Sequence, residues 1–148
     1  MERALAVVDP SDAAKDLVRE AGELAAGVDA ELVLVHVTTE DEYDERRDAM
    51  ESIPDESVSY TLDRAQEGGR QFARDVGTEV LGDVDVDYRV IGAVGERAER
   101  ILAVANGEDC DHVFVAGRDR SPTGKAVFGD AAQRVILGFD GAVTVVTS

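Results

Sequence analysis

The sequence predicts an α/β fold, a single domain over residues 1–148 built on a doubly wound, five-stranded parallel sheet. Unbroken apolar runs at 4–8 and 32–37 are typical of strands that are buried on both faces, as in a parallel sheet. Between the strands, apolar residues recur every three or four positions, which is the period of an amphipathic helix. A chain of 148 residues also suits one domain of roughly 100–200 residues.

The first expected strand, at 4–8, leads into a helix that has Ser11 or Asp12 as its N-cap and ends at Gly27. The inward positions of this helix are Ala14, Leu17, Val18, Ala21, Leu24 and Ala25. The second expected strand is 32–37.

A highly charged stretch follows at 38–59, and we interpret it as a solvated loop with room for a short charged helix at 41–50. The next helix is expected at 62–81. Its positions toward the sheet are Ala65, Gly69, Phe72, Ala73, Val76 and Val80.

The third strand is predicted at 84–90, where apolar and polar residues alternate. Alternation indicates one wetter face, so we place this strand at an edge of the sheet, and Gly92 and Gly95 interrupt the chain after it. The remaining elements are a helix with Ala98, Ile101, Leu102 and Ala105 inward and Gly107 as its stop, a strand at 112–116, a helix at 131–137 and a strand at 142–146.

The charge balance excludes several classes of partner. Asp and Glu number 32 against 15 Lys and Arg, so the net charge is −17 and the pI is near 4.3. Such a chain repels nucleic-acid phosphates and anionic lipid, and we expect it to bind neither DNA, RNA nor membrane. With only Lys15 and Lys125 as lysines and 5% aromatic residues, the composition is typical of halophilic proteins, whose excess acid is screened by salt. The alternative is an acidic surface for a basic partner.

Cysteine and metal chemistry have little support in the sequence. Cys110 is the single cysteine, so no intramolecular disulfide forms, and no Cys/His cluster offers four zinc ligands. Near the N-terminus an acid and a proline interrupt the apolar run too early for a signal peptide, and no apolar run approaches 18 residues. We therefore expect a cytoplasmic protein with no metal site.

A glycine-containing stretch at 115–130 connects the fourth expected strand to the last helix. Together with Asp9 and Val37 at two strand ends and the pattern Gly95-x-x-Ala98-x-x-Ile101, it makes the chain resemble the universal stress protein family from Arg3 to Val146. The resemblance implies the strand order 3-2-1-4-5. It also implies a site for an adenine nucleotide, ATP or AMP with Mg²⁺, at the carboxyl ends of the strands.

In nucleotide-binding members of that family the loop reads Gly-x2-Gly-x9-Gly-Ser/Thr, and its backbone N–H groups cradle phosphates. Gly117 and Gly129 match the first and last glycines. Arg120 stands at the second glycine, only eight residues separate it from Gly129, and Asp130 replaces the Ser/Thr. A carboxylate at this helix start repels phosphate, whereas the three cations within 118–125 attract it.

The resemblance assigns nucleotide contacts to Asp9, Val37, Ala116, Gly117, Arg120, Gly129 and Asp130. Alternatives stay open for two of them, because Asp9 also suits a turn and Val37 also suits ordinary core packing. His36 is interpreted as a buried core histidine. No Ser-His-Asp set or paired carboxylates can be argued, so we expect no catalytic residue and no enzyme, with slow nucleotide hydrolysis or self-phosphorylation left open.

Two functions follow from these observations. The first is a non-catalytic stress-response module that binds an adenine nucleotide and acts as a homodimer. The alternative is a dimer of the same family that has lost nucleotide binding and acts through protein partners. In both, the homodimer pairs through the last strand, Ala142, Val143, Thr144, Val145 and Val146, because an apolar edge strand invites pairing with another copy.

Overall fold

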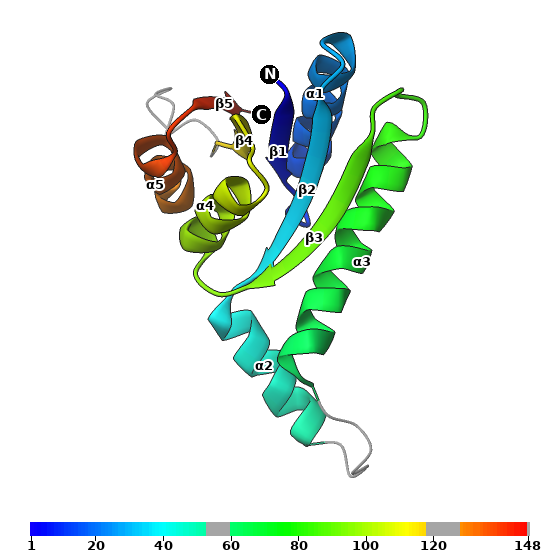
Figure 1. Cartoon of the computed structure of the whole chain (residues 1–148). Helices are drawn as coiled ribbons and strands as arrows, with labels where there is room; N and C mark the ends of the chain where they lie inside the picture. Colours follow the sequence, from blue (N-terminus) through cyan, green and yellow to red (C-terminus); the bar gives the residue numbers. More distant parts are fainter. Residues whose placement is uncertain (53–59, 118–127, 148) are drawn as a thin grey trace.

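Five parallel strands form the centre of the molecule in the order β3-β2-β1-β4-β5, which confirms the predicted sheet (Figure 1). The computed structural model describes residues 1–52, 60–117 and 128–147. The strands are β1 (Arg3–Val7), β2 (Glu31–Thr38), β3 (Tyr88–Val94), β4 (His112–Ala116) and β5 (Ala142–Val146). The helices are α1 (Asp12–Gly27), α2 (Glu40–Glu51), α3 (Leu62–Leu81), α4 (Arg97–Gly107) and α5 (Asp130–Gly138).

Helices cover both faces of the sheet, and each face has its own hydrophobic core. On one face α1 and α3 pack against a core that is centred on Phe114 and Leu34. On the other face α4 and α5 cover a core that includes Leu5, Val35 and Val113. All five residues are fully buried, as the unbroken apolar runs predicted.

Helix α1 shows how local signals set the limits of an element. The Ser11 side chain accepts a hydrogen bond from Ala14 N at 3.2 Å, so Ser11 is the N-cap, as predicted. After Gly27 the chain reverses at Asp29, whose φ is 58°. Leu24, predicted to face inward, is instead 44% exposed, because it lies at the border of the apolar stripe.

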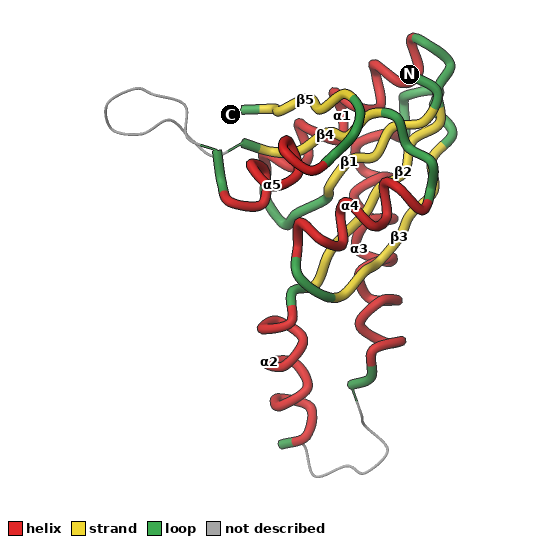
Figure 2. Tube along the Cα trace, turned by 60° about the vertical axis from the view of Figure 1, so that its left-hand side comes forward, coloured by secondary structure: helices red, strands yellow, loops and turns green. Residues whose placement is uncertain are grey.

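The charged stretch after β2 forms a helix over its first part. Helix α2 begins at the N-cap Thr39, has no buried residue and projects away from the sheet beside the start of α3 (Figure 2). The predicted charged helix at 41–50 is therefore present, while residues 53–59 lie outside the part that the structure describes. No described helix is long and apolar enough to cross a membrane.

The third strand was predicted too early in the chain. It spans Tyr88–Val94 at the sheet edge, and Gly92 lies inside it rather than ending it. Residues 82–84 instead form a turn after α3, where Val84 N donates to Leu81 O at 3.1 Å, and residues 85–87 lead from this turn into β3. The alternating valines of this segment pack against the edge of the core without entering the sheet.

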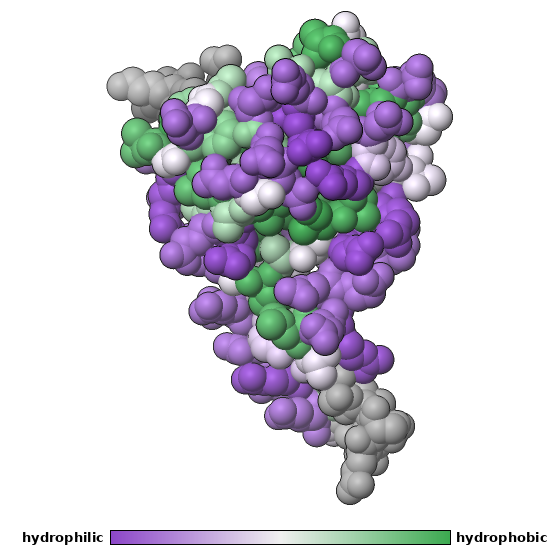
Figure 3. Space-filling view, viewed as in Figure 1, coloured by the Kyte–Doolittle hydropathy of each residue, from purple (hydrophilic) through white to green (hydrophobic). Residues whose placement is uncertain are grey.

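Hydrophilic residues cover most of the visible face, with apolar areas between them (Figure 3). Hydrophilic residues alternate with small apolar areas and do not gather in one region of that face. This distribution agrees with the spread of acidic residues along the sequence.

Two glycines allow α3 to approach β3 closely. A Cβ atom on Gly92 would overlap the carbonyl oxygen of Gln66 and lie 2.8 Å from Arg70 N, both of which belong to the α3 backbone. A Cβ atom on Gly69 would lie 3.2 Å from Gly92 Cα. In contrast, a Cβ on the adjacent Gly68 meets nothing within 4 Å.

We expect Gly92→Ala to lower the free energy of unfolding by roughly 2–3 kcal/mol, because the helix backbone must move to admit the methyl group. The matched control Gly68→Ala should raise it by up to about 1 kcal/mol, since alanine favours a helix and the space is open. Urea unfolding in KCl measures both values. Equal effects of the two substitutions would contradict this account of the packing.

Candidate functional site

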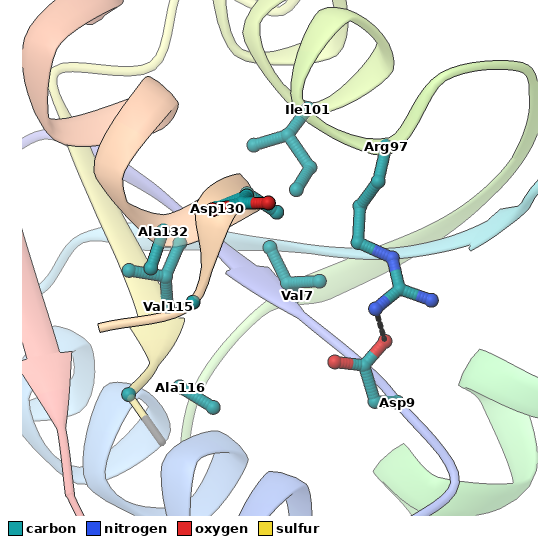
Figure 4. Close-up of a pocket in the computed structure, with 11 residues that line it drawn as sticks. Val7, Asp9, Arg97, Ile101, Val115, Ala116, Asp130 and Ala132 are labelled. Carbon is teal, nitrogen blue, oxygen red and sulfur yellow. Dashed lines mark ion pairs between the residues drawn. The ribbon is translucent and has the colours of Figure 1, made fainter. Parts of the chain in front are cut away.

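A cavity of about 290 Å³ lies at the carboxyl ends of β1 and β4, between the first turns of α4 and α5 (Figure 4). It is lined by Val7, Asp9, Arg97, Ile101, Val115, Ala116, Gly117, Gly129, Asp130, Ala131 and Ala132. Strands β1 and β4 are neighbours in the sheet, yet the chain leaves β1 toward β2 on the other side. The cavity therefore lies where the strand order reverses, which is the usual ligand position in doubly wound sheets.

The inner wall of the cavity is apolar. The wall consists of four buried residues of the core beneath α4 and α5, namely Val7, Ile101, Val115 and Ala132. These side chains come from two strands and two helices, so the wall is part of the packed interior rather than of a loop. A surface of this kind suits a flat, largely apolar group.

The start of α5 forms a second wall, and its N-cap residue supplies no side-chain cap. Gly129 is the N-cap residue and provides no side-chain hydrogen bond. By comparison, the other four described helices are capped by Ser11, Thr39, Thr61 and Glu96. Free N–H groups at a helix start attract anions.

Asp130 is the first residue of α5 and also lines the cavity. Its negative charge lies at the positive end of the helix dipole, which stabilises the helix. The same charge opposes any anionic ligand that would use these N–H groups. The start of α5 thus combines an attractive backbone with a repulsive side chain.

A charged group stands opposite α5. Arg97, the first residue of α4, extends its guanidinium toward Asp9 at the end of β1 (Figure 4). Arg97 Nη1 lies 4.0 Å from Asp9 Oδ1, and Nη2 lies 3.8 Å from Glu42 Oε1 on α2. Both separations exceed hydrogen-bond length, so these are loose ion pairs. Arg97 Nε is shielded from solvent and has no hydrogen-bond partner among the described residues.

An ion pair connects the two helices that border the cavity. The Glu96 carboxylate caps α4 by accepting from Glu99 N at 2.7 Å, and it also pairs with Arg134 on α5. The cavity walls are therefore joined above the sheet.

Five of the seven predicted site residues line this cavity, namely Asp9, Ala116, Gly117, Gly129 and Asp130. Val37 does not line it. It is 1% exposed and packs in the core on the same face of the sheet. Arg120 lies outside the described residues, as do the other loop cations of 118–125.

Sequence reasoning missed Arg97 and the apolar wall. The pattern Gly95-x-x-Ala98-x-x-Ile101 marked the start of α4, but Arg97 inside it resembled any exposed residue of a helix start. The available signal was position, because Arg97 lies three residues after the end of β3 and two residues after Gly95, whose φ is +147°. Val7 belongs to the first expected strand, 4–8, and in the structure it is buried in the sheet and also lines the cavity.

Gly117 has a packing role beside any role in binding. A Cβ atom there would lie 3.0 Å from Val145 Cγ1 and 3.1 Å from Thr147 Cγ2. Gly117 N also donates to Val146 O at 2.9 Å. A larger residue at this position would therefore press on the end of β5.

The remaining candidate groups lie away from the cavity. His36 is 8% exposed, and its Nδ1 lies 2.7 Å from Val8 O, which confirms a buried core histidine. Burial raises the pKa of the Cys110 thiol to about 11, so this cysteine is a poor nucleophile at neutral pH. Among the described residues, no group of three His, Cys, Asp or Glu side chains could hold a metal ion.

Comparison with known proteins places this geometry in a family. The family model of the universal stress protein family matches residues 1–147. Among curated proteins, no sequence matches the chain significantly.

Solved structures with the same fold include a universal stress protein from Lactobacillus plantarum, with 19% identity, a TM-score of 0.67, and coverage of 98% of this chain and 97% of that one. A universal stress protein in complex with cAMP has 15% identity, a TM-score of 0.66 and coverage of 99% and 96%. One from Archaeoglobus fulgidus in complex with dAMP has 18% identity, a TM-score of 0.56 and coverage of 99% and 97%. The family model covers nearly the whole length, and the sheet order agrees with the order that the resemblance implied. The chain belongs to the universal stress protein family.

Proposed function

We propose that the chain binds an adenine nucleotide, ATP or AMP, in the cavity at the ends of β1 and β4. The observation that carries this proposal is the combination of an apolar wall with an uncapped helix start in one cavity. The base would pack on the wall that includes Val7 and Ile101. A phosphate would accept hydrogen bonds from the first N–H groups of α5.

Relatives with the same fold support the choice of ligand. The universal stress proteins crystallised with cAMP and dAMP both hold adenine nucleotides. With ATP, Mg²⁺ would accompany the phosphates as their counter-ion.

The proposed role is sensing rather than turnover. The titratable side chains that line the described cavity are Asp9, Arg97 and Asp130. Asp9 is paired with Arg97, and Asp130 lies at the positive end of the α5 dipole. Each carboxylate therefore has an electrostatic partner within the protein. We infer that the ligand acts through conformation or assembly.

A second candidate function is favoured by Asp130. A carboxylate at the start of α5 opposes phosphate, and in that case the chain would work through protein partners without a nucleotide. The two candidates differ in one measurable property, which is the affinity for nucleotide.

The proposal includes a homodimer that forms through β5. This strand is an edge of the sheet, and four of its five residues are partly exposed. Leu137 on the adjacent α5 is 87% exposed, and Ile136 is 38% exposed. Apolar side chains beside a free edge favour pairing with a second copy around a two-fold axis.

We expect calorimetry to show micromolar or tighter binding of ATP or AMP to protein stripped of bound ligand, in KCl with Mg²⁺. Binding at one site per chain would support the sensing role. Absence of heat with both nucleotides would overturn it in favour of the partner-protein role.

Replacing the carboxylate at the helix start should strengthen binding. We expect Asp130→Ser to tighten AMP binding by about fivefold, since one repulsive charge leaves the anion site. The control Asp140→Ser removes a charge from the exposed turn after α5, which does not line the cavity. Equal affinity in both variants would show that phosphate does not approach α5.

The dimer has its own test. Light scattering should give twice the chain mass of 15.8 kDa, and Leu137→Glu should give the monomer mass, because a charge would be buried at the pairing face. The matched control Leu24→Glu changes a leucine that is 44% exposed on α1 and should leave the dimer intact. A monomeric wild-type chain would contradict the proposal.

A further inference from the structure

Arg97 is the single cationic side chain among the described residues that line the cavity. In a chain of net charge −17, a cation at this position has a strong effect on which ligands can enter. Asp9 and Asp130 line the same cavity, so an anionic ligand meets attraction at Arg97 alone among the described side chains.

The hydrogen-bonding capacity of Arg97 is largely unused within the described part of the chain. Its ion pairs with Asp9 and Glu42 span 4.0 and 3.8 Å, too long for direct hydrogen bonds. Its Nε is shielded from solvent and has no partner there. A shielded donor without a partner is costly, and a ligand oxygen would relieve that cost.

A second polar atom without a partner in the described residues belongs to Thr38, the last residue of β2. Thr38 is 1% exposed, and its Oγ1 has no hydrogen-bond partner in the described residues. The backbone carbonyl of Thr38 accepts from Gly95 N at 3.0 Å, two residues before Arg97. The junction of β2 with the start of α4 thus contains two unused polar atoms.

We propose that Arg97 is a phosphate-binding residue of the cavity, and that the phosphate competes with Glu42 for its guanidinium. This inference rests on the proposed nucleotide function. A guanidinium presents its N–H groups in a planar fork that matches two phosphate oxygens. Its present partners are loosely held, so reorienting it toward a ligand breaks no short hydrogen bond.

The competition links the cavity to α2. Glu42 lies in the first turn of α2, a helix without any buried residue. A phosphate that binds Arg97 would break the ion pair between Arg97 and Glu42, and this would weaken the contact of α2 with α4. The coupling is reciprocal. If phosphate binding weakens the affinity of a partner for Glu42 or strengthens it by some factor, that partner changes the affinity for phosphate by the same factor, and a partner that neutralises Glu42 would strengthen phosphate binding.

The test compares AMP with adenosine, because the two ligands differ only in the phosphate. Calorimetry is carried out at the lowest KCl concentration at which each variant remains folded. The wild-type chain should bind AMP more tightly than adenosine. Arg97→Gln should weaken AMP binding by about tenfold and change adenosine binding by less than about twofold, as expected for loss of a charge-assisted hydrogen bond.

Two further variants make the test specific. Glu42→Gln should tighten AMP binding by about twofold, because the competitor for the guanidinium is removed. Arg100→Gln, on the same helix but not lining the cavity, should change neither affinity.

The outcomes separate this inference from the function on which it rests. If Arg97→Gln weakens AMP and adenosine equally, or changes neither, Arg97 does not bind the phosphate, and the inference is overturned while nucleotide binding stands. If the wild-type chain binds neither ligand, the inference and the proposed function fail together.

Discussion

The parallel pairing of β1 with both β2 and β4 is the constraint on which the rest of the molecule depends. It places two strand ends side by side, while the strand that follows each of them in the chain lies on the opposite side of the pair, β2 beside β1 and β5 beside β4. The pairing is reinforced at its other end. The Asp111 carboxylate accepts from Glu2 N at 2.9 Å and from Arg3 N at 3.3 Å, and these bonds hold the pKa of Asp111 below its usual value. The cavity is thus a consequence of topology.

Within that cavity the walls have different origins. The apolar wall belongs to the core, where close packing restricts the positions of the side chains. The charged rim belongs to helix starts, where Arg97 and Asp130 remain partly exposed and can respond to a ligand. A rigid wall beside an adjustable charged rim suits recognition of a ligand with an apolar base and an anionic group.

Helix α2 contacts a charged residue of the cavity, Arg97. Helix α2 buries none of its residues, so its stability comes from its Thr39 cap and its surface charges rather than from the core. Its first turn carries Glu42, which shares Arg97 with Asp9. The guanidinium of Arg97 therefore connects the cavity to α2, the helix that buries none of its residues.

The sequence by itself determined the fold class, the order of the elements and five of the residues that line the cavity. Unbroken apolar runs predicted the buried strands, and the glycine-containing stretch together with Asp9 pointed to the strand ends where the cavity lies, because these signals are local. Tertiary structure decided the rest. Gly92 resembled a chain break, yet it lies within β3, because its meaning depends on the α3 backbone packed against it. Val37 packs in the core, whereas Arg97 lines the cavity. The sequence could not separate these two cases, because the distance between a helix start and a strand end is set only when distant segments pack together.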